Sequence, residues 1–271
     1  MFSGGSTTYY DSQSGQHVSI HDETKITAYL RTTGQPEAAY EMGMAGSIIT
    51  LPQQPQKDSC MIEVIKSLGS SSSNNNNIFL HILPSQYYDL VVAKERNDTS
   101  IPSNINLCFE YNSNDGEHIS SNVQSAMANF DGIQTSIGVF NPSYLLDDDP
   151  MLVAAQIASI IDTTSEFGGT ISNILVASIT DNDDALSSSS GTCDDELVQL
   201  CEELSYLDVP GSTIKSRLVV SALSSDQLEE CLQMGITKYI IDASDDSEHV
   251  ESKLAMLRDA VEESGKELIL E

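Results

Sequence analysis

The chain of 271 residues carries 41 Asp and Glu against 12 Lys and Arg, a formal net charge of −29 at pH 7, so its composition argues against partners that are themselves strongly anionic. Nucleic acids and anionic membrane surfaces are bound through clusters of cations, and we expect neither as a partner. The five cysteines form no Cys-x-x-Cys pair, and the chain has neither a membrane-spanning apolar run nor a secretory signal pattern, so we expect a cytoplasmic protein with reduced thiols.

Three polar segments stand apart from the apolar part of the sequence. Residues 1–24 are rich in Ser, Gly, Thr and Tyr without an apolar period, which predicts a flexible leader. Residues 70–77 are four serines followed by four asparagines, and 187–191 contain a second serine run. Such tracts cannot bury enough surface to offset their ordering entropy, so we expect loop inserts in one folded domain over residues 25–271.

Eight short segments rich in β-branched and aliphatic residues follow one another along this domain, each with room for a helix behind it. Segments such as 174–177 and 218–220 are continuously apolar, as expected for parallel strands covered on both faces. Eight strand–helix units predict a single (β/α)8 TIM barrel of the α/β class. A doubly wound open sheet is the alternative, but residues 32–34 (Thr-Thr-Gly) hold one glycine where a dinucleotide fingerprint needs three. The predicted strands span 26–30, 47–50, 78–83, 106–111, 134–140, 173–179, 217–223 and 238–242.

Helical periodicity occurs between these strands. Apolar residues recur three and four positions apart over 152–161, 228–232 and 250–261. Asp149 and Pro150 precede the first of these stretches, as a capping acceptor and a proline of the first turn. Gly235 follows the second, in the position where a helix ends in the left-handed conformation.

Several segments carry a family resemblance in their order along the chain. The closest runs from 216–222 (Ser-Arg-Leu-Val-Val-Ser-Ala) to 231–236 (Cys-Leu-Gln-Met-Gly-Ile), with weaker matches at 45–52 and 132–135. Over about residues 26–262 the chain resembles transaldolase and bacterial fructose-6-phosphate aldolase. The resemblance implies a single-domain β/α barrel of carbohydrate metabolism, in the pentose phosphate context, with transaldolase-type transferase or aldolase activity.

The lysine that this family uses is missing from its expected place. The family's chemistry requires a lysine on the fourth strand, because a primary amine must add to the sugar ketone to form a Schiff base. Aligned on residues 115–116 (Asp-Gly), that position is Phe109, with Glu110 next to it, and the lysines fall elsewhere. The resemblance therefore implies a pseudoenzyme without Schiff-base catalysis, and we assign it no catalytic residue, no cofactor and no metal.

The carboxyl ends of barrel strands carry the ligand-binding groups, so candidates are sought there. Thr50, Asp184 and Ser221 match family positions, whereas Arg31 replaces the family's acidic residue and could hold an anion bidentately. Asn141 could bind a hydroxyl or phosphate. The alternatives are an Arg31 ion pair with one of the many carboxylates, and ordinary turn residues at Asn141 and Ser221. The predicted site for a small anionic ligand or sugar phosphate thus comprises Arg31, Thr50, Asn141, Asp184 and Ser221.

Other polar residues have simpler interpretations. Arg217 and Lys238 open their strands, so we expect them at the opposite end of the barrel in surface roles. His81, within the third strand, is interpreted as a core or solvated histidine rather than a general base. The acidic run 147–149 is explained better as a helix start than as a metal site.

Three functions stay open on the sequence. The first is a transaldolase-like protein without Schiff-base catalysis that binds a small anion at the C-terminal mouth of the barrel. The second is an active transaldolase or aldolase with a relocated lysine. The third is an acidic scaffold that contacts protein partners through its surface and serine-rich loops, and a homo-oligomer is compatible with each.

Overall fold

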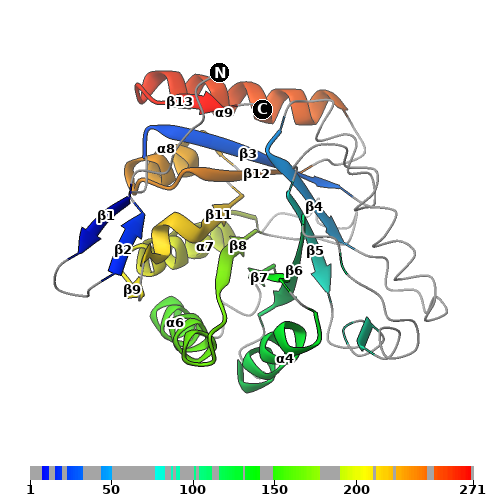
Figure 1. Cartoon of the computed structure of the whole chain (residues 1–271). Coiled ribbons are helices and arrows are strands. Elements are labelled where there is room, and N and C mark those ends of the chain that lie inside the picture. Colours follow the sequence, from blue (N-terminus) through cyan, green and yellow to red (C-terminus); the bar gives the residue numbers. More distant parts are fainter. Residues whose placement is uncertain are drawn as a thin grey trace.

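The strands of the computed structural model form one closed barrel (Figure 1). The structure describes residues 8–11, 16–19, 23–32, 44–50, 77–82, 87, 90–91, 101, 104–111, 116–130, 132–140, 149–177, 190–209, 212–221, 224–242 and 247–269. Each strand pairs in parallel with its neighbours in chain order, and the last pairs with the first. The barrel strands are β3 (Lys25–Thr32), β4 (Gly46–Thr50), β5 (Asn77–Ile82), β6 (Ile105–Glu110), β7 (Gln134–Val139), β8 (Ile171–Val176), β11 (Leu218–Val220) and β12 (Lys238–Asp242).

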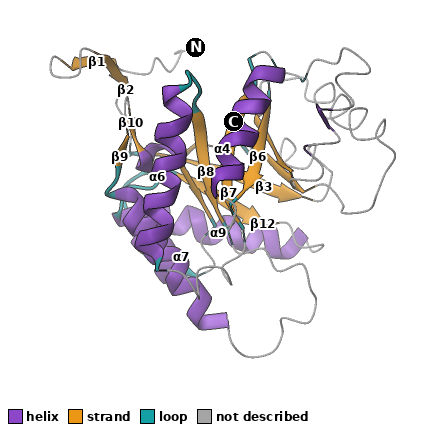
Figure 2. Ribbon diagram, turned by 90° about the horizontal axis from the view of Figure 1, so that it is seen from below, coloured by secondary structure: helices purple, strands orange, loops and turns teal. Residues whose placement is uncertain are grey.

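Helices form the outer layer around these strands (Figure 2). Consecutive helices pack against one another around the outside of the barrel. The helices described are α4 (Gly116–Asn129), α6 (Pro150–Glu166), α7 (Ser190–Ser205), α8 (Ser225–Gln233) and α9 (Ser247–Glu263). The (β/α)8 barrel predicted from the strand pattern is therefore confirmed, and the open sheet is not formed because β12 pairs with β3.

The predicted helix signals act as expected. The Asp149 side chain accepts a hydrogen bond from the backbone N–H of Met151, and Pro150 occupies the first helical position of α6. Ser224 and Gln227 form a reciprocal capping box at the start of α8. Gly235 follows α8 with φ of +80°, a backbone conformation that glycine adopts without a steric penalty.

Two apolar clusters are separated by the barrel wall. The larger lies between the strands and the helices. The smaller fills the interior of the barrel, and we call it the inner layer; within it the rings of Tyr29 and Phe79 meet edge to face at 5.3 Å between centroids. The inner layer consists of Tyr29, Ile48, Phe79, Cys108, Phe140, Leu175, Ala177, Val219 and Ile240.

Smaller elements surround the barrel. A hairpin of β1 (Thr8–Asp11) and β2 (Gln16–Ser19) lies within the segment expected as a leader, whose flexibility stays a prediction. The β9–β10 hairpin (Asp208–Val209 and Ser212–Thr213) leads into the short helix η2 (Ile214–Arg217), and β13 (Glu267–Ile269) pairs with the start of β3. The predicted inserts lie outside the described residues, except for residue 77, which opens β5, and residues 190–191, which open α7. Among the described helices none is both long and apolar enough to span a membrane.

Candidate active site

Strand alternation determines which polar side chains enter the barrel. Side chains two residues apart on a strand face the same side, so residues in phase with the inner layer also point inward. At the carboxyl ends of the strands this phase selects Arg31 on β3, His81 on β5, Glu110 on β6, Ser221 after β11 and Asp242 on β12. These residues surround the end of the barrel where a (β/α)8 enzyme carries its site.

Arg31 and Asp242 form an ion pair across neighbouring strands. They are direct partners in the β12–β3 register, and Arg31 Nη1 lies 2.8 Å from Asp242 Oδ2. The Arg31 side chain is 14% exposed and that of Asp242 is 40% exposed. The structure thus contains the carboxylate pairing weighed as the alternative for Arg31. The ion pair occupies one of the five N–H groups of the Arg31 guanidinium, so other N–H groups could still bind an anion. The anion-binding role of Arg31 stays a prediction.

His81 and Glu110 form a second polar pair on the adjoining strands β5 and β6. His81 Nε2 lies 3.3 Å from Glu110 Oε2, and the side chains are 8% and 23% exposed. The other ring nitrogen, Nδ1, is buried without a hydrogen-bond partner among the described residues. A carboxylate only accepts hydrogen bonds, so the ring hydrogen of His81 lies on Nε2, which donates a hydrogen bond to Glu110. The more exposed carboxylate is therefore held in place by the more buried imidazole.

Phe140 covers this pair from the end of β7. Its ring and the His81 ring lie 4.5 Å apart between centroids. The Phe140 ring occupies the space that a side chain at Gly138 would need, since an added Cβ would overlap ring carbons. Glycine at this position therefore lets the aromatic ring fold back onto the histidine.

Gly138→Ala is expected to lower the free energy of unfolding by about 1–3 kcal/mol, the usual cost of adding a methyl group to a packed interior. The Cβ would push the Phe140 ring away from His81. Urea unfolding of the variant and the wild type measures the loss. An unchanged midpoint would show that the ring moves at no cost.

Glu110, and not Phe109, occupies the inward position at the end of the fourth barrel strand. The Phe109 side chain belongs to the outer cluster and meets the Tyr87 ring edge to face at 5.4 Å. The residue aligned on residues 115–116 with the family's lysine, Phe109, thus faces the helices, whereas Glu110 is in phase with the barrel interior. Asn106, Cys108 and Glu110 share one parity, and Cys108 belongs to the inner layer. That alternation is the sequence signal that could have identified Glu110.

The remaining predicted residues have different outcomes. Ser221 is 8% exposed and its backbone N–H donates to Val176 O at 2.9 Å, next to the mouth. Thr50 ends β4, but its side chain is outside the described part of the chain, as are Asn141 and Asp184. Arg31 lies next to Asp242, a residue that the sequence does not predict as its partner.

Of two expectations about single residues, one is confirmed and one needs correction. His81 is buried, as expected of a core histidine, and it lies at the mouth in contact with a carboxylate. Lys238 begins its strand at the far end of the barrel, as expected, but it is inward-facing and partly buried, so a surface role is wrong. That error concerns the facing of a side chain, which a strand boundary alone does not determine.

Comparisons with known proteins show a similarity of fold alone. A scan of protein-family models and a search of curated proteins each found no match. Among solved structures, the 4-hydroxy-tetrahydrodipicolinate synthase of Methylacidiphilum fumariolicum SolV is 12% identical with a TM-score of 0.50, over 88% of this chain and 77% of that one. Phospho-2-dehydro-3-deoxyheptonate aldolase of Thermotoga maritima is 8% identical with a TM-score of 0.49, over 97% and 75%. FabK of Thermotoga maritima is 11% identical with a TM-score of 0.42 over 79% of this chain, which spans 58% of the FabK chain.

Proposed function

We propose that this chain is an aldolase-like β/α barrel of carbohydrate metabolism that binds a small hydroxylated anion, such as a sugar phosphate, at its C-terminal mouth. It acts there by proton transfer through Glu110 and not through a Schiff base. The observation that carries the proposal is the His81–Glu110 pair on inward positions of neighbouring strands. The resemblance to transaldolase and fructose-6-phosphate aldolase supports the substrate class.

Glu110 has the properties of a general base. Its carboxylate is partly exposed and accepts a hydrogen bond from the buried imidazole of His81. Cys108, two residues earlier on the same face of β6, is fully buried. When a ketone is bound, the carboxylate removes a proton from the carbon next to the carbonyl. The C–H electron pair forms a carbon–carbon double bond while the π pair of the carbonyl moves onto its oxygen, which gives an enolate, and the proton stays on Glu110 until it is returned. His81 is a positioning residue, because its donated hydrogen bond fixes the carboxylate.

Arg31 supplies the positive charge that an anionic ligand or an enolate oxygen needs. It lies on the inward face of β3, and β4 is the strand between it and His81. Fixed cations aimed at a developing negative charge lower the barrier of such reactions. Asp242, paired with Arg31, orients the guanidinium, and its partly exposed carboxylate can accept hydrogen bonds from hydroxyl groups of a ligand.

Schiff-base chemistry is disfavoured at this mouth. A carboxylate occupies the inward position at the end of the fourth strand, and a carboxylate cannot form an imine with a ketone. Lys238 does point into the barrel, but from the other end and beyond the inner layer. The function with a relocated lysine therefore needs an amine from another part of the chain.

Isotope exchange tests the proposal directly. The protein is incubated in D₂O with dihydroxyacetone or fructose 6-phosphate, and proton NMR follows the signal of the hydrogens on the carbon next to the carbonyl. Protein-dependent loss of that signal is the expected result, with no adduct after borohydride reduction. An adduct on a lysine would establish Schiff-base catalysis instead. Neither exchange nor an adduct would leave the acidic scaffold as the better description.

A further inference from the structure

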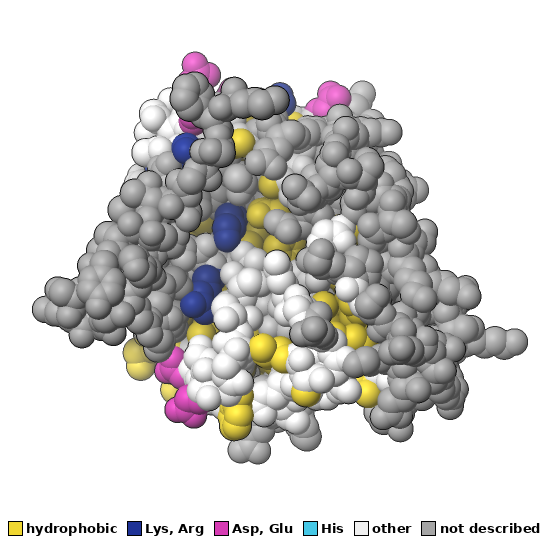
Figure 3. Space-filling view, in the orientation of Figure 1, with side chains coloured by type: hydrophobic (Ala, Val, Ile, Leu, Met, Phe, Trp, Pro, Cys, Tyr) yellow, Lys and Arg dark blue, Asp and Glu magenta, His cyan; other side chains and the backbone are white. Residues whose placement is uncertain are grey.

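Two neighbouring helices on the outside of the barrel carry a long surface without charged side chains. Residues 119–129 of α4 and 150–161 of α6 contain no Asp, Glu, Lys or Arg. The two helices pack against each other and lie side by side in Figure 1. Figure 3 shows mostly uncharged side chains over this part of the molecule, with acidic side chains at one margin. Charged residues make up 20% of the chain, so two such segments in contact are unexpected. We call their exposed side the uncharged face.

Apolar side chains are exposed on the α6 part of this face. Met151 and Leu152, in the first turn of α6, are 58% and 55% exposed, and they are two of the four large apolar side chains that are exposed among the described residues. Ala155 and Ser159 follow Met151 at intervals of four residues and are also exposed. Exposed apolar residues gathered on one element are typical of an interaction site.

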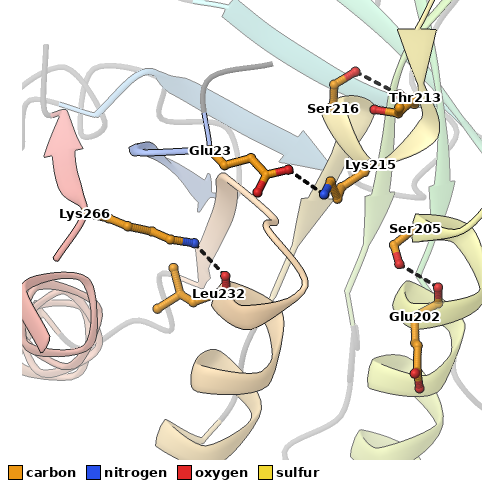
Figure 4. Close-up of polar contacts among 8 residues, drawn as sticks. All are labelled: Glu23, Glu202, Ser205, Thr213, Lys215, Ser216, Leu232 and Lys266. Atoms are coloured by element: carbon orange, nitrogen blue, oxygen red, sulfur yellow. Dashed lines mark hydrogen bonds and ion pairs between the residues drawn. The ribbon is translucent and has the colours of Figure 1, made fainter. Parts of the chain in front are cut away.

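The other described helices carry charge on their outer surfaces. Asp226, Glu229 and Glu230 are exposed on α8, and α7 and α9 are similarly rich in Asp and Glu. Figure 4 shows part of this side of the barrel, where Lys215 Nζ lies 2.5 Å from Glu23 Oε1. Charge is thus distributed unevenly around the barrel, with the uncharged face on α4 and α6 and acidic surfaces on α7, α8 and α9.

This distribution of charge selects the partner that fits the uncharged face. A basic protein would be steered toward the acidic helices and not toward a face without charge. A second copy of this chain, which also carries a net charge of −29, is repelled wherever carboxylates of the two molecules meet. When the uncharged faces of two copies meet, residues 119–129 and 150–161 bring no formal charges together. The face therefore suits a second copy of this chain.

The exposed side of α6 has the geometry for two helices to cross. Met151, Ala155 and Ser159 are spaced four residues apart and form one exposed ridge. Ridges with this spacing pack into the grooves of a second helix at a crossing angle of about −50°. Ala155 lies at the middle of the ridge, where its small side chain allows close approach. At this angle the helix ends diverge, which keeps Asp149 and Asp162 of one copy away from those of the other.

We propose that the uncharged face is a homodimer interface, in which two copies of α6 cross at Ala155 about a two-fold axis and α4 flanks the contact. A two-fold axis places the same patch of both subunits in contact, so the patch needs to complement only itself. A helix of 17 residues is about 25 Å long and about 10 Å wide, so α4 and α6 together offer on the order of 500 Å² per copy. The total of about 1,000 Å² is near the lower limit for a specific interface, which predicts a weak, concentration-dependent dimer. The dimer is independent of the proposed reaction at the mouth.

Sedimentation velocity at protein concentrations from about 1 to about 100 µM tests the interface. The wild type is expected to change from monomer to dimer across this range. Ala155→Glu places two carboxylates opposite each other at the two-fold axis and should weaken association at least about tenfold. Ala255→Glu makes the same substitution at an exposed position of α9 and should associate as the wild type does. Both variants add the same charge to each copy, so a difference between them reports the position of the interface.

Two measurements on the unaltered protein cover the case in which Ala155→Glu does not fold. Association of the wild type should strengthen as salt is added, because salt screens the repulsion between two acidic copies. Hydroxyl-radical labelling, read by mass spectrometry, should show Met151 and Leu152 protected in concentrated protein relative to dilute protein. Tyr206, which is 75% exposed after α7, is the internal control and should be labelled equally in both. A wild type that stays monomeric, equal association of Ala155→Glu and Ala255→Glu, association that weakens with salt, or unchanged labelling of Met151 and Leu152 would each overturn the proposal.

Discussion

Glu110→Gln is expected to slow ketone proton exchange at the mouth by about 10²–10⁴-fold, the range that a positioned general base contributes. Glutamine has nearly the same shape and keeps an oxygen that can accept from His81 Nε2, so the pocket should stay intact. Affinity for the ketone should therefore change little while the exchange rate falls. The exchange rate and affinity are measured by proton NMR in D₂O and by calorimetry.

Two further variants make this result interpretable. Glu251→Gln removes an exposed carboxylate on α9 and should leave exchange unchanged. His81→Asn removes the imidazole that positions Glu110 and should give an intermediate loss in rate with ligand still bound. Exchange at the wild-type rate in Glu110→Gln would show that another group moves the proton.

Phe79→Ala is expected to reduce the free energy of unfolding by about 3–5 kcal/mol, the range for removing a buried aromatic ring. Phe79 is 1% exposed, belongs to the inner layer, and packs edge to face on Tyr29. The barrel interior is enclosed by hydrogen-bonded strands on all sides, so it cannot collapse readily into the cavity left behind. Urea unfolding measures the loss in free energy of unfolding, with the same dependence on urea concentration used for the variant and the wild type.

Phe167→Ala is the matched control for that experiment. Phe167 is 69% exposed at the end of α6, so removal of its ring should change stability by no more than about 0.5 kcal/mol. Similar losses in the two variants would contradict the assignment of the inner layer as a packed interior.

The architecture was accessible from local sequence patterns. Continuous apolar runs separated by helical periodicity identified all eight barrel strands, and the caps at Asp149 and Gly235 placed helix ends correctly. These signals depend on backbone geometry and burial within a few residues, which neighbouring side chains largely determine.

The candidate site was less accessible. Arg31 was placed at the mouth, but its partner Asp242 lies 211 residues away and meets it because β12 closes the barrel onto β3. The spacing from residues 115–116 favours Phe109 over Glu110, and a shift of one residue exchanges the inward and outward faces of a strand.

The sequence by itself determined the repeating strand–helix order, the strongly negative net charge and the absence of a lysine from the fourth strand, because composition and local periodicity are properties of neighbouring residues. Only the tertiary structure decided that His81 supports Glu110 at one end, while Lys238 pairs with Asn173 at the other. These pairings come from strand register and barrel closure, which bring together side chains that no local pattern connects.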